Sequence, residues 1–98
     1  MRVSGKIWGL TEQIEANGVF ELHRIEITKG GFCSKHLHKH KFNGFFVESG
    51  ELEIHVWKND YDLVDITVLK AGDYTAVKPG EYHMFKANEE TVCFEVYW

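Results

Sequence analysis

Three histidines alternate within one short segment that lies between glycine-marked turns. His36, His38 and His40 occupy every second position after Gly30-Gly31 and before Gly44. Successive side chains of an extended strand point to opposite faces, so we expect a strand on which the three imidazoles share one face. In a helix, His38 would point away from the other two. Imidazoles gathered on one face of a strand could supply part of a transition-metal site.

A second segment combines turn residues with another histidine. Gly72-Asp73 is followed by Lys78-Pro79-Gly80, and His83 and Asn88 come after them. The first segment has a comparable layout, because His38 is followed by Asn43 and then by Gly50. Two blocks that combine turn residues with histidines therefore stand out in the sequence.

Short strand patterns separated by turns must position these residues. Apolar and β-branched residues alternate with polar ones in five clear segments, 20–28, 52–57, 63–69, 74–77 and 91–98. Asn17-Gly18 predicts a hairpin turn of type I′, and Lys58-Asn59-Asp60 predicts another turn. No segment has a sustained helical period. The pattern predicts an all-β sandwich or barrel with eight or so strands.

Composition restricts the possible partners. The 98 residues suit a single domain, and the net charge of −4 with a pI near 5.8 disfavours nucleic acid and anionic membranes. Lys35, Lys39 and Lys41 are expected on a solvated strand face. No apolar run approaches the roughly 18 residues that a membrane span needs. Cys33 and Cys93 are expected to be reduced thiols, which favours a cytoplasmic protein.

The two segments resemble the two motifs of the cupin superfamily, motif 1 at about residues 30–50 and motif 2 at about 72–88. The resemblance implies one domain over residues 1–98 with the small double-stranded β-helix, or jelly-roll barrel, of an RmlC-like cupin. It also implies one divalent transition metal (Fe, Mn, Ni, Zn or Cu) inside the barrel, bound by His36, His38 and His83.

This sequence departs from the motifs in the ligand set. Asn43 replaces the glutamate of motif 1, which removes one negative charge from the expected metal shell. Glu48 cannot replace that glutamate, because it has the opposite strand parity. Lys78 replaces the first proline of motif 2, and Ala87 occupies its asparagine position. Four alternatives stay open: ligation by the Asn43 carbonyl oxygen, ligation by His40, a site of three histidines, or loss of the metal.

Two functions compete on this basis. One is a metalloenzyme of dioxygenase or isomerase type that acts on a small polar molecule in the barrel, with Tyr74, Tyr82 or His40 as weak candidates for proton transfer. The other is a non-catalytic module that binds a sugar-like ligand or senses a metal. We also expect a homodimer, because surplus apolar residues such as Trp8, Trp57 and Trp98 would then be covered.

Overall fold

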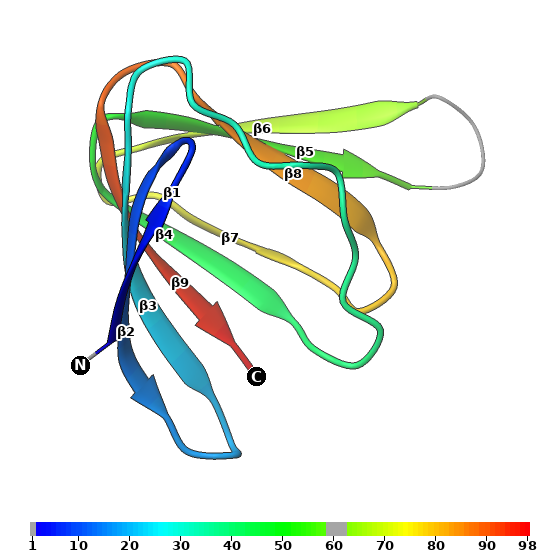
Figure 1. Ribbon diagram of the computed structural model, residues 1–98. Helices are drawn as coiled ribbons and strands as arrows, with labels where there is room; N and C mark the ends of the chain where they lie inside the picture. The colour runs from blue at the N-terminus through cyan, green and yellow to red at the C-terminus, as the bar shows by residue number, and fades with distance from the viewer. Residues whose placement is uncertain (1, 59–62) are drawn as a thin grey trace.

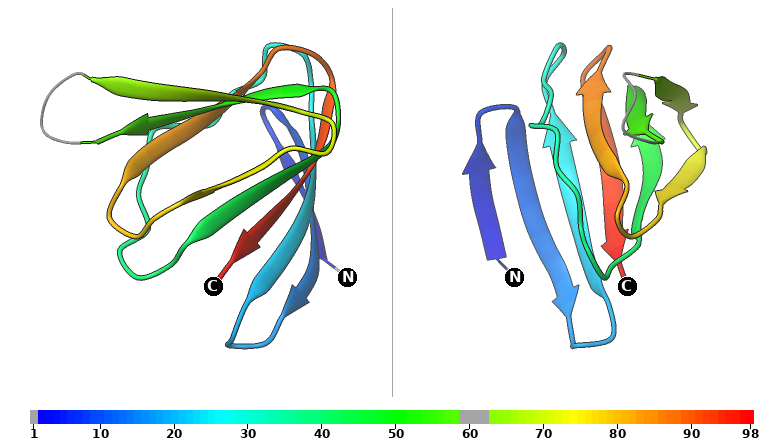
Figure 2. Two further views of the ribbon diagram at one scale, coloured as in Figure 1. Left: turned by 180° about the vertical axis from the view of Figure 1, so that it is seen from behind. Right: turned by 90° about the vertical axis from the view of Figure 1, so that its right-hand side faces the viewer.

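The computed structural model describes residues 2–58 and 63–98, which form nine strands in two facing antiparallel sheets (Figure 1, Figure 2). The larger sheet has the order β1-β2-β3-β9-β4-β7, and the smaller has the order β6-β5-β8. The strands are β1 (Arg2–Lys6), β2 (Gly9–Ala16), β3 (Glu21–Ile27), β4 (Asn43–Ser49), β5 (Glu51–Trp57), β6 (Val64–Lys70), β7 (Tyr74–Val77), β8 (Tyr82–Ala87) and β9 (Thr91–Tyr97). The described residues contain no helix. The prediction of an all-β jelly roll is confirmed.

The core lies between the sheets, where the inward positions of the strands alternate with outward ones. In the larger sheet, Ile25 pairs with Cys93, and Cys93 pairs with Val47, so one row of buried apolar side chains crosses three strands. Leu52, Ile54, Leu69, Phe85 and Ala87 cover this row from the smaller sheet. Figure 1 shows the two sheets meeting where β4 turns into β5 and diverging toward the opposite side.

The hairpin between β2 and β3 forms at Asn17-Gly18, as the sequence predicts, but its turn is not type I′. Gly18 has a φ of +81°, whereas Asn17 has a negative φ. Asn17 instead accepts hydrogen bonds on Oδ1 from the amides of Val19 and Phe20, at 2.9 and 3.0 Å. An asparagine that caps its own turn in this way does not need the left-handed conformation. The predicted turn at Lys58-Asn59-Asp60 lies partly outside the described residues.

The histidine segment is not the regular strand that its alternation predicts. Residues 28–42 form a loop that follows β8 in antiparallel direction and touches it at two isolated bridges, Phe32 with Lys86 and His36 with His83. Between the bridges, the loop advances four residues while β8 advances three. One extra residue near Ser34-Lys35 therefore acts as a bulge, and the strict two-residue alternation of faces is lost.

Both cysteines are free thiols, and Cys93 is completely buried in the core. This agrees with the expectation of reduced cysteines. In the described part of the chain, no helical segment has the length and hydropathy that a membrane span requires.

Candidate metal centre

The loop and β8 bring three histidines together between the sheets. His36 and His38 come from the loop, and His83 comes from the inward face of β8. One nitrogen of each ring lies within 4.8 Å of the corresponding nitrogen of the other two. The ring centroids of His36 and His83 are 4.3 Å apart, and His38 lies 5.1 Å from His36 and 5.5 Å from His83. These three are the residues to which the cupin resemblance assigns the metal.

Backbone carbonyls favour one tautomer for two of these rings. Nδ1 of His36 lies 2.7 Å from the Ser34 carbonyl, and Nδ1 of His83 lies 3.0 Å from the Glu81 carbonyl. A carbonyl only accepts hydrogen bonds, so Nδ1 of His36 carries the proton and its Nε2 keeps a lone pair. Both nitrogens of His83 face an oxygen acceptor, and the shorter contact, at Nδ1, favours the same tautomer. Nε2 of His38 is buried and has no hydrogen-bond partner within the described residues. In metal sites, a histidine commonly binds the metal through one ring nitrogen and is oriented by a hydrogen bond from the other, as the Nδ1–carbonyl bonds would do here.

Asn43 adds an oxygen to this group. Its side chain is only 1% exposed at the start of β4, and Oδ1 lies 3.2 Å from Nε2 of His83. Its Nδ2 donates to Oε2 of Glu95 at 3.3 Å, which orients the amide with the oxygen toward the histidine. A neutral His83 has one proton for two oxygen acceptors, the Glu81 carbonyl and Asn43 Oδ1, so with that proton on Nδ1 a cation bound to Nε2 and Oδ1 would satisfy both atoms. The donor set of imidazole nitrogens and an amide oxygen fits a divalent transition metal.

Burial favours the neutral form of two of these imidazoles, His83 and His38, which is the form that a metal requires. Desolvation lowers the pKa of His83 to about 4, and the neighbouring His36 and His38 act in the same direction. Burial also lowers the pKa of His38, with smaller contributions from His36 and Lys41. His83 is therefore neutral near pH 7, and a neutral imidazole offers its lone pair to a metal without first losing a proton.

Glu95 and Tyr97, which sequence reasoning did not select, lie next to the histidines on β9. Glu95 is 7% exposed, and Tyr97 donates to its Oε2 at 2.6 Å. The ring of Tyr97 lies 5.1 Å from that of His38. Burial raises the pKa of Glu95, although the bonds from Tyr97 and Asn43 act in the opposite direction. Burial and the adjacent carboxyl also raise the pKa of Tyr97.

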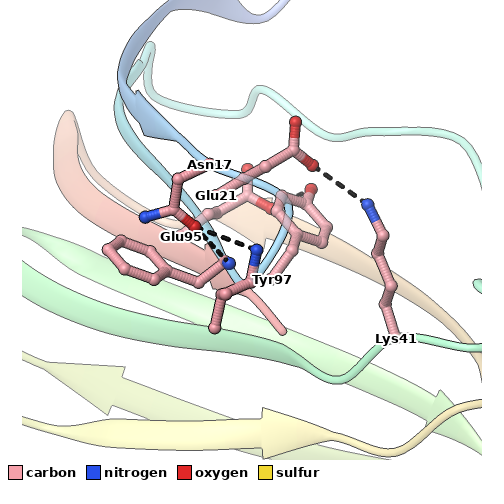
Figure 3. Close-up of polar contacts among 7 residues, drawn as sticks. Asn17, Glu21, Lys41, Glu95 and Tyr97 are labelled. Carbon is pink, nitrogen blue, oxygen red and sulfur yellow. Dashed lines mark hydrogen bonds and ion pairs between the residues drawn. The ribbon is translucent and has the colours of Figure 1, made fainter.

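Figure 3 shows Glu95 and Tyr97 beneath the hairpin that Asn17 caps, with Lys41 approaching from the loop. Lys41 forms an ion pair with Glu21 at 3.2 Å, which ties the end of the histidine loop to β3. The next residue, Phe42, exchanges backbone hydrogen bonds with Trp98, and the two rings stack 5.2 Å apart. The loop that carries His36 and His38 is thus fastened both to β8 and to the larger sheet.

The other candidates from the sequence lie away from the histidine group. His40 is exposed in the loop and is not one of the three grouped histidines. Tyr74 and Tyr82 are 51% and 48% exposed, so neither is enclosed with the histidines. Glu48 is exposed on β4, as its strand parity predicts. His55 lies on the outer face of the smaller sheet, where its Nε2 is 2.8 Å from Glu53.

A cavity of about 410 Å³ opens beside the metal-binding group, between the larger sheet and the loop. His36, Glu95 and Tyr97 line one part of it, and Trp8, Phe45 and Phe85 supply apolar wall. The edge of Trp8 meets Phe85 with ring centroids 5.1 Å apart. This volume is within the range of small-molecule sites and could hold a small ligand in reach of the three histidines.

This combination of a two-sheet barrel and converging histidines is matched by a protein-family model. The model for the cupin domain covers residues 23–98, so the chain belongs to the cupin family. No curated protein sequence matches it significantly.

Solved structures share the fold at low sequence identity. KdgF from Halomonas sp. superposes with a TM-score of 0.85 at 12% identity, over 99% of this chain and 86% of that one. An RmlC-like cupin from Shewanella frigidimarina gives 0.80 at 22% identity, over 98% and 81%. An oxalate oxidase in complex with glycolate gives 0.76 at 16% identity, over 89% and 49%. At such identities the likeness establishes the fold, and function must be argued from the site.

Proposed function

We propose that this protein is a small metal-dependent cupin that acts on a small polar molecule bound in the barrel cavity. The observation that carries the proposal is the set of imidazole lone pairs. The carbonyls of Ser34 and Glu81 favour protonation of His36 and His83 on Nδ1, and Nε2 of His38 is buried without a partner among the described residues. A transition metal is the species that would satisfy all three nitrogens at once.

His36, His38 and His83 would hold the metal, and Asn43 Oδ1 is the nearest additional donor. When bound, such a metal would supply either Lewis-acid polarisation of a ligand oxygen or redox chemistry. Three or four protein ligands would leave positions open for the molecule in the cavity. Which metal of the set Fe, Mn, Ni, Zn and Cu is bound depends on the supply of each metal in the cell as well as on the type of ligand.

The neighbouring carboxyl favours proton transfer, as in an isomerase, over oxygen-dependent chemistry. Glu95 lines the cavity beside His36, and its raised pKa brings a buried carboxyl closer to the pH at which it can both accept and donate a proton. Tyr97 and Asn43 both bind Oε2, so the carboxyl is held in one orientation. The alternative of a binding module without turnover remains the competing function, and it would use the same cavity.

Metal analysis of the untagged protein tests the proposal directly. We expect close to one transition-metal ion per chain by mass spectrometry, and we expect the metal to be lost in both His36→Ala and His83→Ala. His55→Ala is the matched control, because His55 lies on the outer face paired with Glu53 and should leave the metal content unchanged. A parent protein that holds no metal, even after reloading, contradicts the proposal.

A turnover measurement separates the enzyme from the binding module. For any molecule that binds in the cavity, an isomerase should exchange a carbon-bound proton with deuterated solvent, visible by nuclear magnetic resonance. Glu95→Gln should abolish this exchange while the metal content stays at the parent level. Binding without exchange in the parent protein would favour the non-catalytic module.

A homodimer is the arrangement that would cover the outer face of the larger sheet. Phe94, Phe46 and Tyr74 pair across β9, β4 and β7 on that face, and Phe46 is 41% exposed. Such a row of aromatic side chains on a sheet surface is typical of a contact between proteins. Light scattering after size-exclusion chromatography should give twice the chain mass. A monomer at micromolar concentration would contradict this assignment.

A further inference from the structure

The inward face of the larger sheet changes from apolar to polar along its strands. The row Ile25–Cys93–Val47 is buried and apolar. The next inward row consists of Gln13 on β2, His23 on β3 and Glu95 on β9, and each residue pairs directly with the next. Polar side chains on the core face of a sheet lower stability unless they find hydrogen-bond partners. Glu95 has partners within the chain in Tyr97 and Asn43, whereas Gln13 and His23 stay available to a molecule in the cavity.

This row, which we call the polar row, lines the 410 Å³ cavity, and its polar atoms are available there. The side chains of Gln13 and His23 form no hydrogen bond with the described residues, and both bonds to Glu95 end on Oε2. Oε1 of Glu95 has no such partner in the described part of the chain. An amide, an imidazole and a carboxyl oxygen together can donate to and accept from the hydroxyl groups of a ligand.

A positive charge lies on another part of the cavity wall. Lys6, at the end of the edge strand β1, lines the cavity and forms no ion pair with any described carboxylate. The hydroxyls of Ser4 and Thr11, which pair with each other on β1 and β2, line the cavity as well. A lysine ammonium next to hydroxyl groups favours an anionic group such as a carboxylate.

The remaining wall is apolar and aromatic. Trp8, Phe45 and Phe85 also line the cavity, and Phe45 continues the row beyond Glu95 as its cross-strand partner on β4. A ligand that fits both kinds of wall has a carbon chain with C–H groups for the rings and hydroxyls for the polar row. A purely apolar acid would leave the polar row without partners, and a neutral polyol would leave Lys6 without a counter-charge.

We infer that the cavity binds a small hydroxylated carboxylate, with the carboxylate at Lys6 and the hydroxyls at Gln13, His23 and Glu95. This inference rests on the proposed function, because the same molecule would reach the metal at His36. It names the substrate class of that site. A ligand of this kind would explain why a sheet with an apolar core has three polar residues in adjacent strands.

Calorimetric titration of the metal-loaded protein tests the inference. The probes are glycerate, threonate and gluconate, which carry both groups, together with sorbitol, which lacks the carboxylate, and hexanoate, which lacks the hydroxyls. We expect saturable binding of at least one hydroxy acid and binding at least tenfold weaker for sorbitol and hexanoate. Lys6→Ala and Gln13→Ala should each weaken the hydroxy acid about five- to tenfold, the effect of one lost hydrogen bond or charge contact.

Lys86→Ala is the matched control, because Lys86 is exposed on β8 and its side chain lies on the opposite face from His83. It should leave the affinity unchanged. Metal content is measured on every sample. A metal-loaded parent that binds no hydroxy acid, that binds sorbitol or hexanoate equally well, or that is insensitive to both substitutions overturns the inference and leaves the proposed function intact. A parent that takes up no metal overturns the proposed function and this inference with it.

Discussion

His83 and Asn43 face each other across the barrel with an acceptor on each side. Nε2 of His83 lies 3.2 Å from Oδ1 of Asn43, while Nδ1 of the histidine lies 3.0 Å from the Glu81 carbonyl. The amide of Asn43 cannot rotate without giving up its bond to Glu95. A neutral imidazole can donate to only one of these two oxygens, so one contact lacks a hydrogen bond in the metal-free protein, and a cation bound to Nε2 and Oδ1 would satisfy both atoms.

The Asn43–His83 contact predicts how substitutions change metal affinity. Asn43→Leu removes the oxygen donor and should weaken metal binding about tenfold or more, because a ligand or its orienting partner typically contributes that much. Asn43→Asp places a negative charge beside the metal and should strengthen binding. Competition with a chromophoric chelator measures both effects.

The aspartate variant should also be less stable without metal, since its carboxylate would replace the donor that now binds Glu95. Asn88→Ala is the control, because Asn88 binds Glu51 through its side chain and is not among the residues around His83. Unchanged metal affinity in Asn43→Leu would show that the site uses the three histidines alone.

Acid should destabilise the metal-free protein through His83. Its pKa is about 4 in the folded chain and 6.5 as the reference value, so between these pH values the unfolded chain binds a proton that the folded chain does not. Stability therefore falls as pH decreases from 6.5 to 4, by a few kcal/mol at most. Urea titrations across this range should show the decline, and His83→Gln should flatten it. An equally steep decline in His83→Gln would show that protonation of His83 does not cause the loss of stability.

Glu95 should act on stability in the opposite direction. Burial raises its pKa, so above the reference value of 4.5 the unfolded chain loses its proton before the folded chain does. The contribution of Glu95 to the free energy of unfolding therefore becomes less favourable as the pH rises from 4.5 through the raised pKa of the folded state. Glu95→Gln keeps an acceptor for Tyr97 and Asn43 and should raise the metal-free melting temperature more at pH 8 than at pH 5. Glu89→Gln, at an exposed turn position, should change neither value.

Two glycines with almost the same backbone conformation should respond differently to alanine. Gly50 and Gly72 have φ values of +90° and +89°, so a side chain is strained at both, by about 1–2 kcal/mol. A Cβ on Gly72 would meet nothing within 4 Å, whereas one on Gly50 would contact the Glu90 carbonyl oxygen and lie 2.8 Å from the Thr91 Cα. Gly50→Ala should therefore lower the free energy of unfolding clearly more than Gly72→Ala. Equal losses by urea denaturation would show that the turn between β4 and β5 can shift.

Most of the strand framework can be predicted from alternation because each strand has one buried face. The interval 74–77 is recovered as β7, and Phe45 and Val47 face inward with Asn43, as their shared parity predicts. In the histidine loop the rule holds for His36 and His38, which reach the same group, and fails at His40, which is exposed where the chain bends. The extra residue near Ser34-Lys35 depends on how the loop meets β8 rather than on local residue preferences.

Glu95 could not be selected from sequence because both faces of β9 look suitable for the core. Val92, Phe94 and Val96 form the more apolar face, yet Cys93, Glu95 and Tyr97 point inward. The pairing of β9 with β3 and β4 determines which face of β9 points into the core, since it places Cys93 between Ile25 and Val47. The resemblance to the cupin motifs points to the three histidines that the structure groups together, but the carboxyl beside them becomes visible only when the strand register is known.

The two backbone hydrogen bonds between His36 and His83, at 3.0 and 2.8 Å, have a consequence for proteolysis. They belong to a series of backbone hydrogen bonds between the loop and β8, which includes the bond from the Cys33 amide to the Phe85 carbonyl. A metal shared by His36, His38 and His83 would add a side-chain link between the same two segments. Loading the metal would thus close a chain loop and suppress its local opening. Trypsin cuts after lysine, and Lys35, Lys39 and Lys41 all lie in this loop as exposed residues. Trypsin should therefore cleave at these exposed lysines more slowly when a metal links the three histidines inside the barrel.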